Sequence, residues 1–468
     1  MSKGKEYVKN TVILLVGKFA TQFISLFLLP LYTHYLLATD FGLVDLYQTY
    51  ISLFVPVFLL CMDSAVFRFL IDVRNNVDEM KKIIVTSLKR TFFQSLIFIT
   101  FAFIFNLMFK LKYFIIIVIN AVVIMFSNVM LQICRGLGKN KSYSMACIIT
   151  ASIILISNIL LIIILKFNAS SILISSSIAN IFCIVYLFIK LKIFKYINLN
   201  NSSKVKEKEI LDYSIPLIPN ALSWWIVNAS DRTIISTLIN TAANGIYTVS
   251  CKFSNILNSI FAIFTMSWQE SASLHINDDD KDVFFTKMIN SIYKFFILIS
   301  LIIIICVSLA FDFLIGNNYM SSYNYIPILI LANSFNVLTG LFGGIYIAKK
   351  LTKKLTATTI ISALINLIIN LLLIKKYGLY AACFSTLISY MLMAIYRYLD
   401  VQKYVKVAIT FKTIIEIIIL FTISFFAYYS RMTVIELLVL LLIVVYSYIS
   451  NKRIINELLR SIKKFLKK

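Results

Sequence analysis

The sequence predicts an all-α integral membrane protein with about fourteen transmembrane helices. The chain of 468 residues is 60% hydrophobic and has a mean hydropathy of +0.89, whereas soluble domains are about half apolar. Apolar stretches long enough to cross a bilayer recur from Val12 to Ile449. The 45 Lys and Arg residues lie mainly between these stretches, as they do in polytopic membrane proteins.

A span needs about 20 apolar residues. On that basis the predicted spans are 11–36, 43–65, 86–109, 113–134, 143–165, 169–193, 213–238, 244–268, 288–313, 323–347, 355–375, 378–400, 408–429 and 433–450.

The basic residues predict the orientation of the spans. With a cytoplasmic N-terminus, 35 of the 45 Lys and Arg residues fall in inside segments or at the inside ends of spans, and six fall in outside turns or at the outside ends of spans. The remaining four, Lys18, Arg232, Lys252 and Lys294, lie deeper within spans. This asymmetry predicts that both termini are cytoplasmic. It also explains the net charge of +24 without nucleic acid as a partner.

The longest charged interruption, Lys190–Asp212, predicts a linker between two halves. The predicted parts are a six-helix lobe at 1–195, a linker at 196–212, a second lobe at 213–406, and two extra helices with a basic tail at 407–468. Gly42 in TDFGLVDLY matches Gly245 in AANGIYTVS at an offset of 203. Six spans separate these copies, so the repeats are expected to be parallel.

Polar residues concentrate in the stretch Ile215–Ala272, which predicts two spans joined by a short turn. The first span has a polar helical face, and so does the second. The two faces consist of Asn220, Trp224, Asn228 and Asp231, followed by Arg232, and of Thr248, Lys252, Asn255 and Ser259. Because a charge at the bilayer centre costs about 2.5–3.5 kcal/mol on insertion scales, the two faces predict a shared hydrated cavity.

The same stretch carries a family resemblance. The pattern P-L-I-P-N-x-L-S-W-W, followed by D-R, G-I-Y and Trp268–Gln269, resembles the Wzx-type polysaccharide biosynthesis flippases. These belong to the multidrug/oligosaccharidyl-lipid/polysaccharide exporter superfamily, which also contains the MATE exporters and the lipid II flippase.

The resemblance implies two six-helix lobes in a MATE-like V, plus two C-terminal helices. A cationic central cavity would bind undecaprenyl-diphosphate-linked oligosaccharide and carry it across the membrane by alternating access. The implied partners are this glycolipid, the bilayer, a polysaccharide polymerase and glycosyltransferases. Heavy use of Ile, Lys, Asn, Phe and Tyr is typical of an AT-rich bacterial genome, which agrees with a bacterial inner membrane.

The cations within spans are candidates for binding the diphosphate. Lys18 is followed by Gln22 one turn later, and Arg232 could grip a phosphate with two parallel hydrogen bonds. Lys252 lies in the second polar face near Asn255. The alternatives are that Lys18 extends to the cytoplasmic surface, and that Arg232 pairs with Asp231 or extends to the outer surface.

Further candidates have other roles. Asn220, Trp224 and Asn228 are expected to line the cavity, although one residue of the Trp224–Trp225 pair is expected only to pack. Asp231 and Asp63 are candidates for coupling transport to an ion, because a carboxylate can bind H⁺ or Na⁺.

The sequence does not predict an enzyme or a cofactor. It contains two histidines, seven scattered cysteines, and no P-loop, metal-ligand spacing or G-x-S-x-G motif. Two alternatives stay open. A MATE-type drug or cation antiporter would favour a cavity dominated by carboxylates. A membrane glycan polymerase or ligase would need a large outer loop, which the predicted spans leave no room for.

Overall fold

The computed structural model describes residues 24–196, 202–409, 411–447 and 449. The side chains at 220, 223, 224, 227, 228, 263, 266 and 411–413 are not described. Every regular element of the described part is helical, which confirms the predicted fold class.

A first helix covers 24–35. The following α-helices are α2 (Ala38–Phe58), α3 (Met62–Asp72), α4 (Val77–Phe109), α5 (Phe114–Gly136), α6 (Asn140–Ile159), α7 (Ser170–Lys190), α8 (Lys204–Ser214), α9 (Ile218–Leu238), α10 (Thr241–His275), α11 (Lys281–Leu314), α12 (Ile326–Ala348), α13 (Thr352–Tyr377), α14 (Leu379–Val401) and α15 (Phe411–Ser430). A last described helix is Thr433–Ser447. Short π and 3₁₀ turns are η1 (Leu160–Ile164), η2 (Ile193–Lys195), η4 (Ile215–Leu217) and η5 (Asn317–Tyr325).

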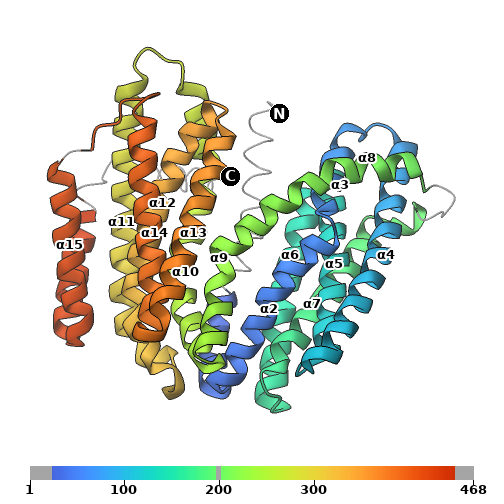
Figure 1. Ribbon diagram of the computed structural model, residues 1–468, viewed down its shortest axis with the longest axis horizontal. Coiled ribbons are helices and arrows are strands. Elements are labelled where there is room, and N and C mark those ends of the chain that lie inside the picture. The colour runs from blue at the N-terminus through green and yellow to red at the C-terminus, as the bar shows by residue number, and fades with distance from the viewer. Residues whose placement is uncertain (1–23, 197–201, 410, 448, 450–468) are drawn as a thin grey trace, which may run out of the picture. The chain divides into compact units, whose positions relative to one another are not determined.

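The helices pack into two compact units, residues 1–245 and 246–468. In unit 1, α5 packs against α3, α4 and α7, and α2 packs against α9. In unit 2, α14 packs against α12 and α13, and α11 lies against α12 and α15 (Figure 1). Helix α9 packs with unit 1, although it begins the predicted second lobe. The predicted domain limits were drawn from a sequence repeat, whereas the two units are defined by packing. Those limits therefore stay a prediction.

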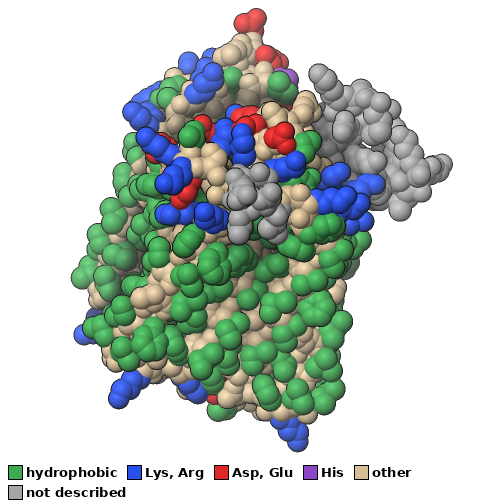
Figure 2. All heavy atoms as spheres, turned by 90° about the vertical axis from the view of Figure 1, so that its right-hand side faces the viewer, with side chains coloured by type: hydrophobic (Ala, Val, Ile, Leu, Met, Phe, Trp, Pro, Cys, Tyr) green, Lys and Arg blue, Asp and Glu red, His purple; other side chains and the backbone are tan. Residues whose placement is uncertain are grey.

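Each of the fourteen predicted spans overlaps a helix of the described residues. Nine of these helices are long and apolar enough to cross a membrane, or ten if bent α10 is counted as one span. Figure 2 shows one face on which hydrophobic side chains form a broad band and most Lys and Arg gather above it. The described residues therefore have the surface of a multi-pass membrane protein.

The predicted span 43–65 is not one continuous helix. Helix α2 contains Pro56 and ends at Phe58, and α3 begins at Met62 after Leu60 and Cys61, which both have positive φ. Residues with positive φ do not continue a right-handed helix, so the helix ends before Leu60. The chain then turns into α3, which the spans did not predict.

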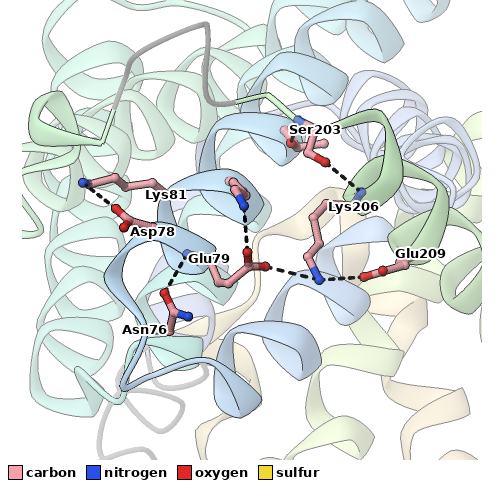
Figure 3. A network of polar contacts seen from close by, with 9 residues as sticks. Asn76, Asp78, Glu79, Lys81, Ser203, Lys206 and Glu209 are labelled. Atoms are coloured by element: carbon pink, nitrogen blue, oxygen red, sulfur yellow. Dashed lines mark hydrogen bonds and ion pairs between the residues drawn. The ribbon is translucent and has the colours of Figure 1, made fainter.

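The helical part of the linker between the halves is fastened to unit 1. Asn76 caps α4 by accepting a hydrogen bond from the Glu79 amide, and Ser203 caps α8 in the same way from the Lys206 amide. The Lys206 ammonium then lies between Glu79 and Glu209, at 3.3 and 2.9 Å (Figure 3). Hydrogen bonds to Glu209 and Glu79 raise the pKa of Lys206. Helix α8 therefore holds the start of α9 on unit 1.

The core of unit 2 is aromatic and centres on Trp268 of the predicted W-Q motif. Trp268 is buried, contacts Phe285 edge to face and donates from Nε1 to the Leu341 carbonyl at 2.9 Å. A methyl group on Gly344 would overlap the Trp268 indole. The glycines of α12 thus let α10 approach closely, which is the packing role expected of small residues in membrane helices.

Two polar clusters fasten the C-terminal helices to α11. In the first, Lys294 of α11 pairs with Glu416 of α15 at 3.2 Å, and the Tyr446 hydroxyl donates to Glu416 at 2.8 Å. In the second, Ser308 of α11 donates to buried Glu436 at 2.6 Å. Lys294 and Ser308 are 14 positions apart, which is about 21 Å along a helix. The two helices outside the repeat are therefore held at two levels.

Two glycines bring the starts of α2 and α10 into backbone contact. A methyl group on Gly42 would overlap the Thr241 carbonyl oxygen, and one on Gly245 would overlap the Ala38 carbonyl oxygen. Asn244 also donates to the Gly42 carbonyl at 2.8 Å. Ala38 and Thr241 differ by the same 203 positions as the two glycines. The contact is therefore reciprocal under the repeat offset.

Candidate functional site

The predicted site residues divide into described and undescribed positions. Lys18 and Gln22 lie outside the described residues, as do the side chains of Asn220, Trp224 and Asn228. The others are distributed over both units: Asp63 on α3, Asp231 and Arg232 on α9, and Lys252 and Asn255 on α10. Unit 1 therefore contains Asp63, Asp231 and Arg232, and unit 2 contains Lys252 and Asn255.

Arg232 forms an ion pair that the sequence did not predict. Its Nε lies 2.9 Å from a carboxylate oxygen of Asp45 on α2. Both side chains are largely buried, with 18% of Arg232 and 12% of Asp45 exposed. Nearby Trp225 packs on the same helix pair, donating from Nε1 to the Thr49 carbonyl at 2.9 Å and stacking on Tyr50. Helices α2 and α9 are thus joined by an ion pair and an indole.

A polar cavity begins one turn along α2 from this ion pair. Gln48 and Ser52 follow Asp45 at i+3 and i+7, so the three share a helical face. The cavity measures about 420 Å³ and is lined by α2, α5 and α7. Its lining residues are Gln48, Ile51, Ser52, Val55, Pro56, Asn120, Ile124, Asn128 and Ser176. All five polar members are uncharged.

A second cavity in unit 1 is apolar. It measures about 250 Å³ between α2, α4 and α5. The aromatic part of its lining comprises Tyr47, Tyr50, Phe54, Phe98, Phe101, Phe105 and Phe114. Ile51 lines both cavities, so α2 has an aromatic side and a carboxamide side.

The two candidate carboxylates have different surroundings. Asp63 lies in the first turn of α3, where the helix dipole stabilises negative charge. Asp231 is partly exposed in the middle of α9, directly before the Arg232 that pairs with Asp45. Asp63 thus lies at a helix start and Asp231 in a helix middle, and an ion-coupling role for either stays a prediction.

The polar face of α10 joins a chain of hydrogen bonds in unit 2. Asn258 donates to the exposed Asn255 at 3.4 Å, and Asn336 of α12 donates to Asn258 at 3.3 Å. Thr339 donates to the Asn336 carbonyl at 2.7 Å and accepts from Arg397 through its own carbonyl at 2.9 Å. This chain connects α10 with α14 and ends at Asn255. Lys252 lies one turn before it and is partly exposed.

Arg397 is a buried cation that the predicted orientation counts among the basic residues of the inside segments. It is 4% exposed, and its guanidinium donates to Thr358, Thr359 and the Leu355 and Thr339 carbonyls. Its position near the end of a span made it resemble an ordinary inside cation. Asp45 was missed too, although a carboxylate inside a predicted span is itself a signal.

Within the described ranges, no three His, Cys, Asp or Glu side chains are grouped so that they could hold a metal ion. The ionisable groups of the two units instead form pairs and small clusters, such as Lys112 with Asp40 at 2.7 Å, where hydrogen bonding to Asp40 raises the pKa of the Lys112 ammonium.

The comparisons with known proteins agree on family and fold. A family model described as polysaccharide biosynthesis protein matches residues 7–268. A structure of the lipid II flippase MurJ, in an inward closed conformation, is 17% identical with a TM-score of 0.70 and covers 95% of this chain and 100% of that one.

Two further solved structures are MATE transporters. An inward-facing multidrug resistance MATE family transporter of the MOP superfamily is 13% identical with a TM-score of 0.68, covering 84% of this chain and 94% of that one. A Vibrio cholerae MATE transporter is 12% identical with a TM-score of 0.56, covering 85% and 96%. No match was found among curated proteins. At these identities the structures establish the fold.

Proposed function

The chain belongs to the polysaccharide biosynthesis protein family, and we propose that it is the flippase for a lipid-linked oligosaccharide. Its cargo is an undecaprenyl-diphosphate-linked repeat unit, carried across a bacterial cytoplasmic membrane for surface polysaccharide synthesis. Both termini face the cytoplasm, and transport proceeds by alternating access. The family match carries this proposal, and the polar groups inside apolar helices support it.

The proposed diphosphate contacts are Lys18, Arg232 and Lys252, with Gln22, Asn220, Trp224, Asn228 and Asn255 around the cargo. A carboxylate partner does not prevent Arg232 from acting, because a guanidinium has five N–H donors. Asp45 lies on the Nε side of this guanidinium. Asp45 then orients the guanidinium across α2 and α9.

The test is export of surface polysaccharide from a host that lacks its own copy of this gene. Lys18→Ala, Arg232→Ala and Lys252→Ala are combined, and we expect export to be lost at normal protein level. A matched triple variant replaces three exposed lysines, Lys208, Lys287 and Lys353, and removes the same charge. Its export should equal that of the wild type. Full export by the first variant would rule out these three contacts.

Deletion of the gene tests the function itself. We expect undecaprenyl-diphosphate-linked oligosaccharide to accumulate on the cytoplasmic leaflet, where a membrane-impermeant glycosidase added outside cannot reach it. Normal surface polysaccharide in the deletion strain would contradict the proposal.

A MATE-type antiporter is the second candidate, because the fold likeness includes multidrug transporters. That function predicts that deletion increases sensitivity to cationic drugs and leaves surface glycan unchanged. The deletion strain therefore distinguishes the two. A glycan polymerase or ligase receives no support from the family or fold matches.

A further inference from the structure

The polar cavity in unit 1 is a site that the diphosphate contacts do not use. It lies along the middle of α2, α5 and α7, helices that are each apolar enough to cross the membrane. Polar side chains at such depth are costly unless they are satisfied. Five of them nevertheless converge here, from three helices.

Two carboxamides in this cavity are available to a ligand. Neither Gln48 nor Asn128 has a side-chain hydrogen bond within the part of the chain that the structure describes, and both are partly exposed. The neighbouring polar groups are held in place. Asn120 donates to the Leu173 carbonyl and the Ser177 hydroxyl at 3.2 and 3.1 Å, and Ser52 donates to the Thr49 carbonyl at 2.6 Å. The side chains of Asn120 and Ser52 are thus held in place, and those of Gln48 and Asn128 can bind a ligand.

The chemistry of the lining selects the kind of ligand. Among the described lining residues there is no Lys or Arg for a phosphate and no carboxylate for a metal ion or a cationic drug, and the polar groups are too many for a lipid chain. A carboxamide both donates and accepts, as a hydroxyl group does. Ile51, Val55, Pro56 and Ile124 add apolar surface beside these amides. An uncharged ring with hydroxyl groups on its edge and C–H groups on its faces matches this mixture.

The cavity has a suitable size and place. Its volume of about 420 Å³ falls within the range of about 300–1,000 Å³ found for small-molecule sites. Along α2 it begins one turn after Asp45, the partner of Arg232. A sugar in the cavity would therefore lie next to the cation proposed for the diphosphate. In a lipid-linked oligosaccharide, sugar and diphosphate are likewise joined directly.

We infer that this cavity binds an uncharged sugar ring of the cargo, with Gln48 and Asn128 reading its hydroxyl groups. The inference rests on the proposed function and adds the part of the protein that recognises glycan. In this role Arg232 serves every cargo with the same diphosphate, and the carboxamides distinguish cargoes by their sugars.

The first test measures binding to the full-length protein in lipid nanodiscs. One probe is undecaprenyl diphosphate, and the other is the lipid-linked oligosaccharide extracted from the host strain. Gln48→Leu and Asn128→Leu are combined. The control is Gln132→Leu on the same helix α5, because Gln132 is not among the lining residues of the cavity and accepts a hydrogen bond from Arg135.

Losing two hydrogen bonds of about 1 kcal/mol each should weaken binding of the oligosaccharide lipid about 10- to 30-fold. Binding of undecaprenyl diphosphate should stay as in the wild type, and the control should bind both lipids normally. An equal loss for both lipids, or no loss for either, would overturn the inference. If the wild type binds neither lipid, the proposed function fails instead.

The second test does not depend on the double variant folding. Ser52→Cys is made in a variant whose seven native cysteines are replaced by serine and whose thermal stability is checked. A hydrophilic thiol reagent should label Cys at this position, and the oligosaccharide lipid, but not undecaprenyl diphosphate, should protect it. Protection by both lipids would assign the cavity to the lipid carrier. If neither lipid protects the thiol at position 52, the cavity binds no part of the cargo and the inference is overturned.

Discussion

At the scale of single residues, buried cations are stabilised in two ways. Arg232 and Lys294 each pair with a carboxylate on another helix. Arg397 is instead surrounded by hydroxyl groups and carbonyl oxygens. A buried charge is tolerated only when partners replace its lost hydration. Lys294, which the sequence placed near the cytoplasmic end of a span, is thereby assigned to structure and not to the cargo.

The Asp45–Arg232 pair should behave as a unit. Replacing either residue by its neutral analogue, Asp45→Asn or Arg232→Gln, should destabilise the protein by about 1–3 kcal/mol, because the remaining charge is largely buried. The double variant should lose less than the sum of the two. Thermal unfolding in detergent measures the three variants, and additive losses would show that the two groups do not interact.

Asp231 and Asp63 can be separated by the same reasoning. We expect Asp63→Asn to leave the response of transport to H⁺ and Na⁺ gradients unchanged. Asp231→Asn should change the response of transport to H⁺ or Na⁺ gradients in proteoliposomes. If transport by the Asp231 variant follows both gradients as the wild type does, Asp231 is not the coupling group.

At the scale of elements, short polar contacts attach the added helices to each unit. Helix α8 is pinned to α4 by Lys206 with Glu79 and by Glu207 with Arg90. The C-terminal helices are pinned to α11 in unit 2. Each extra element is therefore part of one unit and is not a loose attachment.

The Lys294–Glu416 contact can be tested with a matched exchange. Glu416→Ala should destabilise α15 by about 1–3 kcal/mol, because it leaves the Lys294 ammonium without its counter-charge. The combined change Lys294→Met and Glu416→Met keeps the volume and removes both charges, so it should unfold close to the wild-type temperature. Protease sensitivity of α15 in the two variants is the measurement. Equal sensitivity would mean that packing alone holds this helix.

The crossing of α2 and α10 makes a second prediction at this scale. Gly42→Ala or Gly245→Ala should each cost about 1–3 kcal/mol, because each added methyl forces the helices apart. Once one methyl has separated them, the second should cost less. Thr39→Ala, at an exposed position on the same turn of α2, is the control. Thermal stability near that of the wild type in both glycine variants would show that the crossing is loose.

At the scale of the whole molecule, the distribution of basic residues predicts the orientation. A reporter fused at Asn200 should be active on the cytoplasmic side, and one fused at Gly316 on the outer side. The 35-to-6 distribution of Lys and Arg is the physical reason. Outer-side activity at Asn200 would invert the proposed topology.

The sequence predicted the helices far better than their contacts. Spans follow from runs of apolar residues, which every bilayer requires, so each predicted range found a helix. The end of α2 depends on the left-handed backbone of Leu60 and Cys61, which the span pattern does not show. The partners of Arg232, Lys294 and Arg397 lie between 38 and 187 positions away. Only the packing of helices brings them together, so hydropathy could not predict them.

The two glycines also restrict how the chain can evolve. A contact in which Gly42 faces Thr241 while Gly245 faces Ala38 has the form that two identical copies make across a two-fold axis. In such a dimer, one gene change would alter both sides at once. In this chain each glycine is encoded separately. Each one contacts a backbone carbonyl of the other repeat, so no side-chain substitution there can make room for a larger residue. A chimera that takes one half from a relative must therefore bring a glycine to the crossing with it.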